Sequence, residues 1–191
     1  SASLEGNTEL NNWKFAIPLA IAAMLTHFLL PPLASAQRPT TGGLFAFSAS
    51  DSLSYWETPD GSIRVHYSTE GPNQTLLLDG NQDSIPDYVE QVATAAQQSL
   101  ALFTELGFYH PLAEGQFNLD DDGGSSALDF YLVNFEGNSD GYFGVDECNQ
   151  QKCSGYMVVE NDFAGYFYNN ELEALHTVIP HELFHAIQAA Y

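Results

Sequence analysis

Five consecutive residues, His181-Glu182-Leu183-Phe184-His185, have the types and spacing of the hydrolytic zinc motif H-E-x-x-H. On an α-helix, residues i and i+4 lie one turn apart on the same face. Two imidazoles placed in this way can hold one Zn²⁺, and a glutamate beside the first can take a proton from a zinc-activated water. The motif therefore predicts His181 and His185 as zinc ligands and Glu182 as a general base.

The residues after the motif exclude the three-histidine version of such a site. That version continues H-E-x-x-H-x-x-G-x-x-H, whereas this chain has Gln188 in place of the glycine and Tyr191 in place of the third histidine. His176 lies five residues before His181, about 140° away around a helix, so it is a poor co-ligand and is expected at the surface or behind a ligand. A third protein ligand must come from elsewhere.

A second stretch with cation-binding chemistry runs from Asp79 to Glu90. Counted from Asp79, oxygen-bearing side chains fall at positions 1, 3, 5, 9 and 12, which is the spacing of an EF-hand calcium loop. Ser84 occupies the sixth position, where the sharp turn favours glycine. The alternative is a polar loop in which Asp83 or Ser84 caps the following helix. The predicted Ca²⁺ ligands are Asp79, Asn81, Asp83, the Ile85 carbonyl, Asp87 and Glu90.

The net charge of the chain limits the kinds of partner that it can bind. Four Lys and Arg residues stand against 25 Asp and Glu residues, for a net charge of −21. Nucleic acids and anionic membranes repel such a surface. We therefore expect no nucleic-acid partner, and no stable membrane association once an export signal has been removed.

Residues 1–36 have the pattern of an export signal. The apolar run 15–30 follows Lys14, and Ala34-Ser35-Ala36 forms an A-x-A cleavage site. The run is short for a membrane span, although an uncleaved signal anchor remains the alternative. Cleavage after Ala36 predicts a secreted protein.

The two cysteines of the chain, Cys148 and Cys153, both lie in the part that would be exported. An oxidising compartment favours a disulfide between them. Their four intervening residues do not match a C-x-x-C redox or zinc motif, so we expect a local structural disulfide.

The remaining patterns predict an α+β fold. Residues 37–55 lack periodicity and are rich in Ser, Thr and Gly, which indicates a linker or a loosely ordered arm. His66 falls on the polar face of the first strand pattern and is expected at the surface. The segment 136–147 is expected to be a loop. Strands are expected at residues 62–67, 128–133 and 155–160, one helix between Pro86 and Gly107, and a final helix from near Thr177 with Pro180 in its first turn. The pattern also allows an earlier helical turn at residues 171–176.

Several of these pieces occur together: the export signal, IRVHY, DGNQDSIPDYVE, LDFYLV, GYMVVENDF and HELFHAIQAAY. Over residues 60–191 the chain resembles a family of secreted bacterial zinc metalloproteases first described from myxobacteria. The resemblance implies a zincin-like subdomain, with a mixed sheet packed on a long helix and on the active-site helix. Residues 56–191 would be the N-terminal part of a catalytic domain, and a Glu beyond residue 191 would complete the zinc site, as in gluzincins.

The resemblance also implies a peptide or protein substrate. By analogy with the fold, the strand 155–160 is expected to lie along the cleft and to pair with an extended chain. Two other functions stay open: a calcium-dependent surface or adhesion module without catalysis, and a zinc hydrolase that cleaves a bond other than a peptide. A structural role for His181 and His185 in the core is disfavoured, because Glu182 would be costly to bury beside them.

Overall fold

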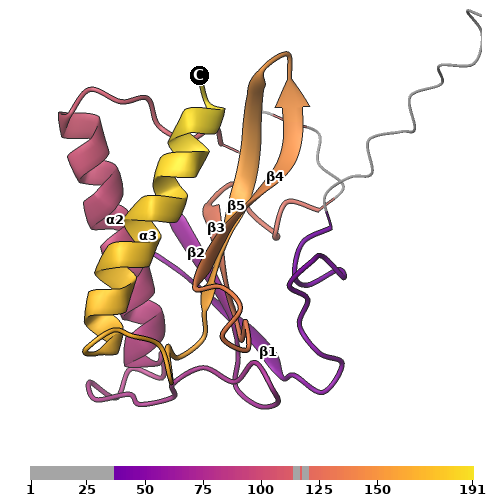
Figure 1. Ribbon diagram of the computed structural model, residues 1–191, viewed down its shortest axis with the longest axis vertical. Helices are drawn as coiled ribbons and strands as arrows, with labels where there is room; N and C mark the ends of the chain where they lie inside the picture. The colour runs from indigo at the N-terminus through magenta and orange to yellow at the C-terminus, as the bar shows by residue number, and fades with distance from the viewer. Residues whose placement is uncertain (1–36, 114–116, 118–120) are drawn as a thin grey trace, which may run out of the picture. The chain divides into compact units, whose positions relative to one another are not determined.

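The computed structural model describes residues 37–113, 117 and 121–191, so the predicted export signal at 1–36 lies outside the described residues. In the described part, a five-stranded mixed sheet carries two helices on one face (Figure 1). The predicted α+β fold is therefore confirmed. The elements in chain order are β1 (Leu53–Glu57), β2 (Ile63–Ser68), α2 (Asp87–Glu105), β3 (Leu128–Val133), β4 (Gly141–Asn149), β5 (Lys152–Glu160) and α3 (Glu171–Ala189).

The strand order across the sheet is β1-β2-β3-β5-β4. Strands β2, β3 and β5 run parallel to one another, while β1 and β4 pair antiparallel with β2 and β5 respectively. The two outer strands are therefore β1 and β4, and β5 is enclosed between β3 and β4.

The main core lies between the sheet and the helices. Strand alternation directs Ile63 and Val65 of β2 and Phe130 and Leu132 of β3 into it, because successive side chains point to opposite faces. Each helix contributes an apolar stripe to the same core. Neither of these two described helices combines the length and the apolar character needed to cross a membrane.

The opposite face of the sheet is covered in part by the segment predicted to be a linker or a loosely ordered arm. Strand β1 begins inside that segment, at Leu53. Arg38 is completely buried, and Phe45 and Phe47 pack on the second apolar cluster. The prediction was wrong here because the segment is held by contacts with distant strands, which its own composition does not reveal. That second cluster contains Tyr131, Val133, Phe135, Tyr156 and Val158.

Helix α3 joins the predicted final helix and the earlier turn at residues 171–176 into one continuous helix. It begins at Glu171, six residues before Thr177, and Pro180 lies inside it. The start is set by Asn170, whose side chain accepts a hydrogen bond from the Glu173 backbone N–H at 2.9 Å. An N-cap and the packing of the apolar face outweigh the hydrogen bond that Pro180 cannot make.

The segment 136–147, predicted to be a loop, contains most of β4. The ladder with β5 shifts between Val145 and Cys148, so two residues of β4 stand opposite Ser154 alone, which is a β-bulge. The bulge and two glycines hide the alternation that would have indicated a strand. At the hairpin end, Cys148 and Cys153 face each other as register partners and form the predicted local disulfide.

Candidate metal and catalytic site

The two histidines of the motif converge at the surface of α3. Both side chains are exposed, and the Nε2 atoms of His181 and His185 lie 3.2 Å apart. Two imidazoles bound at about 2.0–2.1 Å to a tetrahedral zinc ion would have their nitrogens about 3.3 Å apart. The pair therefore fits one zinc ion without a change of helix geometry.

Gln188 orients the second histidine. Its Oε1 lies 2.9 Å from Nδ1 of His185, one turn further along the same face. When Nδ1 donates its proton to this amide oxygen, Nε2 keeps a lone pair and points it towards His181. The helical spacing of the sequence places Gln188 on the same face as His181 and His185, and the contact adds a role: it selects the His185 tautomer that a metal ligand needs.

The side chain of Glu182 points from α3 towards the outer strand β4. The residue is 6% exposed, and a Cβ placed on Gly141 would lie 2.7 Å from its Oε1. Burial raises the pKa of the Glu182 carboxyl, the charges of His181 and His185 oppose that rise, and the charge of Asp140 adds to it. A carboxyl with a raised pKa beside two imidazoles has the character of a general acid and base.

Three site residues carried no signal in the sequence. Gly141 leaves the space that Glu182 fills, because a Cβ would also lie 2.6 Å from the Val178 side chain. Asp140, next to it, accepts a hydrogen bond from the Tyr168 hydroxyl at 2.6 Å. Burial raises the pKa of Tyr168 to about 12, and its hydrogen bond to Asp140 adds to that rise. The start of β4 and the loop before α3 thus meet beside Glu182.

The described residues supply two of the zinc ligands that such a site needs. Within residues 37–113, 117 and 121–191, no three His, Cys, Asp or Glu side chains form a group that could hold a metal ion. His176 is exposed one and a half turns away, as expected. The predicted ligands His181 and His185 and the predicted base Glu182 are therefore brought together, and a third ligand is not among the described neighbours.

Most of the strand predicted to pair with a substrate is not available for pairing. Residues 157–159 of β5 have β3 on one side and β4 on the other, so both hydrogen-bonding edges are used there. The outer strand beside Glu182 is β4, and its free edge is the one that could add another strand. The prediction of 155–160 failed because sheet order depends on contacts between distant strands.

The acidic loop folds around its own carboxylates. Asp79 accepts hydrogen bonds from the backbone N–H groups of Gln82, Asp83 and Ser84, at 2.7 to 3.3 Å. The backbone is left-handed at Ser84, with φ 77°, so the sixth position adopts the turn for which glycine is favoured. Helix α2 begins after Pro86 without a side-chain cap, so neither Asp83 nor Ser84 caps it.

Three of the predicted calcium ligands lie close together in this loop. Asn81 donates hydrogen bonds to Asp83 at 3.1 Å and to Glu90 at 3.2 Å. Burial, followed by the charges of Asp83 and Asp87, raises the pKa of Glu90. Asp87 instead accepts the Gly80 N–H at 3.1 Å. The gathered negative charge suits a cation, and calcium binding stays a prediction.

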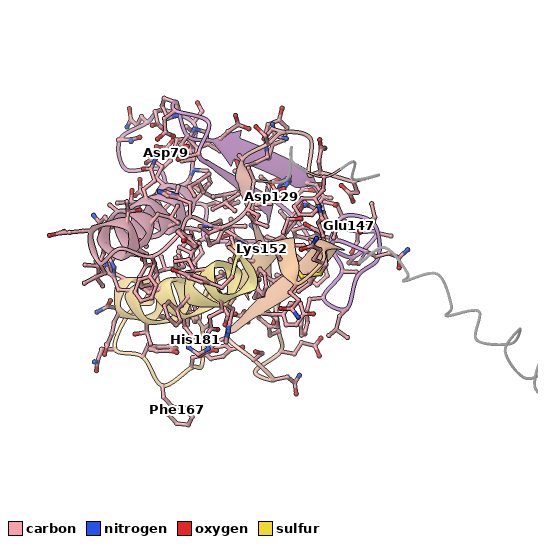
Figure 2. The ribbon with its side chains drawn as sticks, turned by 90° about the horizontal axis from the view of Figure 1, so that it is seen from above. Asp79, Asp129, Glu147, Lys152, Phe167 and His181 are labelled. Atoms are coloured by element: carbon pink, nitrogen blue, oxygen red, sulfur yellow. A yellow bond between two sulfur atoms is a disulfide. The ribbon has the colours of Figure 1, made fainter. Side chains whose placement is uncertain are left out.

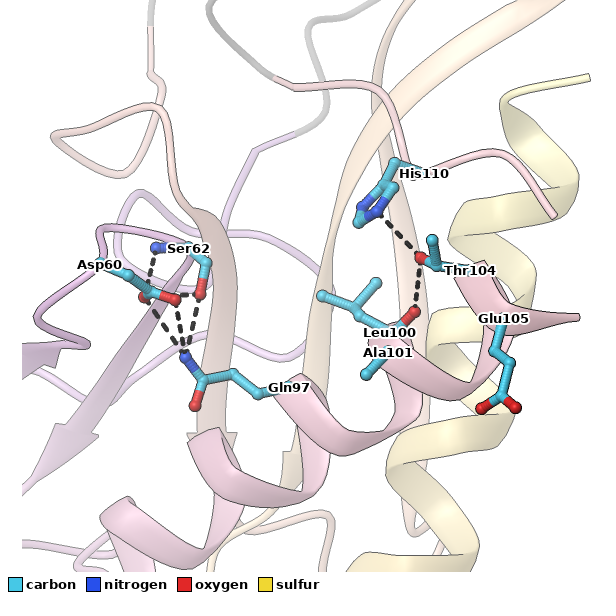
Figure 3. A pocket seen from close by; sticks show the side chains of 8 residues that line it. All are labelled: Asp60, Ser62, Gln97, Leu100, Ala101, Thr104, Glu105 and His110. Carbon is cyan, nitrogen blue, oxygen red and sulfur yellow. Dashed lines mark hydrogen bonds between the residues drawn. The ribbon is translucent and has the colours of Figure 1, made fainter. Parts of the chain in front are cut away.

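A pocket of about 680 Å³ lies away from the histidine motif. It is lined by α2 and by the turn before β2, and it contains no residue of α3 (Figure 3). Gln97 spans it with a hydrogen bond of 3.1 Å to Asp60, while His110 pairs with Thr104 at 2.9 Å. Its polar groups thus bond to one another, and none of the predicted site residues lines it.

His66 lies in a buried polar cluster, contrary to the predicted surface position. The residue is 8% exposed, its Nε2 lies 2.9 Å from Asp129, and its ring stacks on Tyr131. The partner that buries it, Asp129, comes from β3, so spacing along the chain could not reveal the pair. In Figure 2, Asp129 is seen well apart from His181.

No protein-family model, curated protein or solved structure matches this chain. The functional argument therefore rests on the residues and on their geometry.

Proposed function

We propose that this chain contains the first part of the active site of a secreted, zinc-dependent metallopeptidase. The observation that carries the proposal is the convergence of the His181 and His185 Nε2 atoms at 3.2 Å on a helix whose Glu182 faces the outer strand β4. The expected class is a gluzincin-like zincin, in line with the family resemblance. The export pattern of residues 1–36 supports a secreted protein.

His181 and His185 would hold the zinc ion, with Gln188 fixing the tautomer of His185. A zinc ion held there supplies Lewis acidity, polarising a carbonyl and lowering the pKa of water towards about 7. Glu182 takes the proton of the attacking water and later passes it to the leaving amine. Burial raises the pKa of Glu182, which strengthens the carboxylate as the proton acceptor in the first of these transfers.

A third ligand belongs to the proposal. The resemblance implies a Glu that follows Tyr191 on a later helix, as in gluzincins. Three protein ligands and one open position are the pattern of catalytic zinc sites.

The free edge of β4 would bind the substrate. An extended peptide can add to an exposed strand edge through main-chain hydrogen bonds. Strand β4 starts at Gly141, against Glu182, so a peptide paired along it passes the general base. This assignment replaces the strand 155–160 and favours a peptide or protein substrate in extended conformation.

The test uses the full-length protein, secreted and purified with zinc. The expected result is one zinc ion per chain and cleavage of unfolded protein substrates, both lost in a His181→Ala, His185→Ala double variant. Zinc binding without cleavage of any peptide, but with hydrolysis of another bond, would favour the non-proteolytic zinc hydrolase. Absence of stoichiometric zinc would contradict the proposal.

The second candidate is a calcium-dependent extracellular module without catalysis. The EF-hand spacing from Asp79 to Glu90 and the proximity of Asn81, Asp83 and Glu90 favour it. It predicts calcium-dependent stability with neither zinc nor peptidase activity in the full-length protein.

A further inference from the structure

A fully buried arginine holds together three strands of the sheet on the face opposite the helices. Arg38 directs Nη1 to the Asp129 carboxylate of β3, and directs Nε and Nη2 to the two oxygens of Asp146 on β4, at 3.3 and 2.6 Å. Its guanidinium lies 5.4 Å from the ring centre of Tyr156 on the intervening strand β5. The planar fork of arginine can bind two carboxylates at once in this way, which the point charge of lysine cannot.

The position of Asp146 explains why such a link matters. Asp146 lies at the β-bulge, where the ladder between β4 and β5 is interrupted. A bulged outer strand is held by fewer ladder hydrogen bonds and is free to bend. Arg38 fixes this point to Asp129 of β3, whose side chain is completely buried.

The residues after Arg38 contact the same strand a second time. The segment 37–47, named here the N-terminal brace, folds back on itself through hydrogen bonds from the Thr41 and Gly43 N–H groups to the Arg38 carbonyl, at 2.9 and 3.1 Å. It then places Phe45 against Tyr142 of β4, with ring centres 5.3 Å apart. Tyr142 follows Gly141, the residue that faces Glu182.

The brace therefore touches β4 at residues 142 and 146 from behind, while Gly141 faces the Glu182 side chain in front. We propose that Arg38, through Asp146 and with the packing of the brace, is a positioning residue that holds β4 at the distance from α3 at which its free edge can present a substrate to Glu182. The inference rests on the proposed function for its effect on the substrate. The mechanical role of the brace stands on the contacts alone.

The experiment compares Arg38→Gln and Arg38→Lys with Arg64→Gln in the full-length protein. Arg64 is a matched control, because it also bridges a carboxylate, Glu57, and a loop carbonyl, Gly123, but at the β1 edge of the sheet. Hydrogen exchange of the β4 amides is measured first. Both Arg38 variants should speed exchange over residues 141–149 by at least about tenfold relative to the control, with α3 unchanged.

Peptidase kinetics then separate positioning from general stability. With Arg38 replaced, KM should rise at least about tenfold for peptides long enough to pair with β4, while peptides too short to reach it keep their KM and zinc content stays constant. A purely structural loss would lower the active fraction for both lengths alike, and that result overturns the proposal. Unchanged exchange in β4 also overturns it.

Two further outcomes are assigned in advance. If Arg38→Gln does not fold, Asp146→Ala removes both oxygens that bind Arg38 and should show the same localised exchange. Unaltered β4 exchange in that variant counts against the brace. If the wild-type protein has zinc but no peptidase activity, the proposed function fails, and the exchange data alone decide whether the brace positions β4.

Discussion

Two groupings of histidine and carboxylate within the described part of the chain differ in how their polar atoms are used. Behind the sheet, His66, Asp129, Arg38 and Asp146 bond to one another and are almost completely buried. On α3, the rings of His181 and His185 are exposed, and their Nε2 atoms point at each other.

The difference separates a structural site from a candidate metal site. Buried charges that are paired contribute little net stability, but they fix which strands lie together, and removing one partner is costly. The Nε2 atoms of His181 and His185 lie within hydrogen-bonding distance of each other, and the tautomers decide which of them donates. Such a pair becomes favourable when a cation or a proton lies between the nitrogens. The same residue types thus hold strands together on the sheet face opposite the helices, and expose imidazole nitrogens to solvent on α3.

The largest predicted effect tests the exposed grouping on α3, that is His181, Glu182 and His185. Replacing Glu182 by Gln removes the proton acceptor while keeping size and shape, and should lower kcat by about 10²–10⁴-fold or more. Zinc content should not change, because His181 and His185 are intact. Glu171→Gln, an exposed glutamate in the first turn of the same helix, is the control and should keep full activity. Full peptidase activity in the Glu182→Gln protein would remove the general-base assignment.

The second prediction concerns the space in front of β4. A Cβ at Gly141 would meet Glu182 Oε1 at 2.7 Å and Val178 at 2.6 Å, so Gly141→Ala must displace the carboxylate or the strand. Because a misplacement of about 1 Å can cost about 10²-fold in rate, kcat/KM should fall by about one to two orders of magnitude.

Gly107→Ala serves as the control for Gly141→Ala. Gly107 has nothing within 4 Å of a Cβ but a φ of +87°, so this variant should lose stability and keep its activity per folded molecule. Equal activity of the two variants would show that Gly141 is not part of the site.

The contrast between the two groupings also shows what the sequence can predict. The histidine motif was found because one helix positions both predicted ligands and the predicted base, so a spacing of four residues determines how the two histidines lie. The disulfide was predictable for the same reason, since Cys148 and Cys153 face each other across one hairpin. Strand β3 was predicted with its observed bounds because its apolar run is buried on both faces.

The buried cluster could not be predicted in this way. Arg38 meets Asp129 and Asp146, which lie 91 and 108 residues away along the chain. A segment rich in Ser, Thr and Gly therefore looked like a loose arm, and His66 looked like a surface residue. Strand β4 was missed because its bulge interrupts the alternation, which then led to the wrong strand being assigned to the cleft.

The third prediction tests, by its dependence on pH, the buried grouping of His66, Asp129, Arg38 and Asp146. Burial raises the pKa of Asp146 from 3.8 to about 6. Arg38 opposes this rise, but it also binds Asp129, and the charge of Asp129 adds to the rise. The folded state therefore holds this proton more tightly than the unfolded state. The resulting stability is fully present below pH 3.8 and is lost as pH rises through about 6.

The shift corresponds to about 3 kcal/mol across that window. Asp146→Asn cannot ionise, so its unfolding free energy should fall by about 2 kcal/mol less between pH 4 and pH 7 than that of the wild type. Denaturant unfolding at the two pH values measures the difference. Glu147→Gln changes the exposed neighbouring carboxylate and should follow the wild-type curve. Parallel curves for wild type and Asp146→Asn would show that Asp146 does not titrate in this window.

The smallest predicted effect concerns the acidic loop, whose side chains are exposed or half-buried and in part bonded to the loop's own backbone. If the loop binds a cation, Ca²⁺ at a hundred times its Kd should stabilise the folded state by about 2.7 kcal/mol and raise Tm by several degrees. Zinc content should not respond, because the loop precedes α2 and the proposed zinc ligands lie on α3. Melting curves with Ca²⁺ and with a calcium chelator, at constant free zinc, measure the shift. An Asp83→Asn, Glu90→Gln variant should lose it, since both carboxylates that approach Asn81 are then neutral. Equal Tm values for the wild type in the two solutions would show that the loop does not bind calcium. Like the buried grouping, it would then be structural: a turn whose carboxylates accept hydrogen bonds from its own N–H groups.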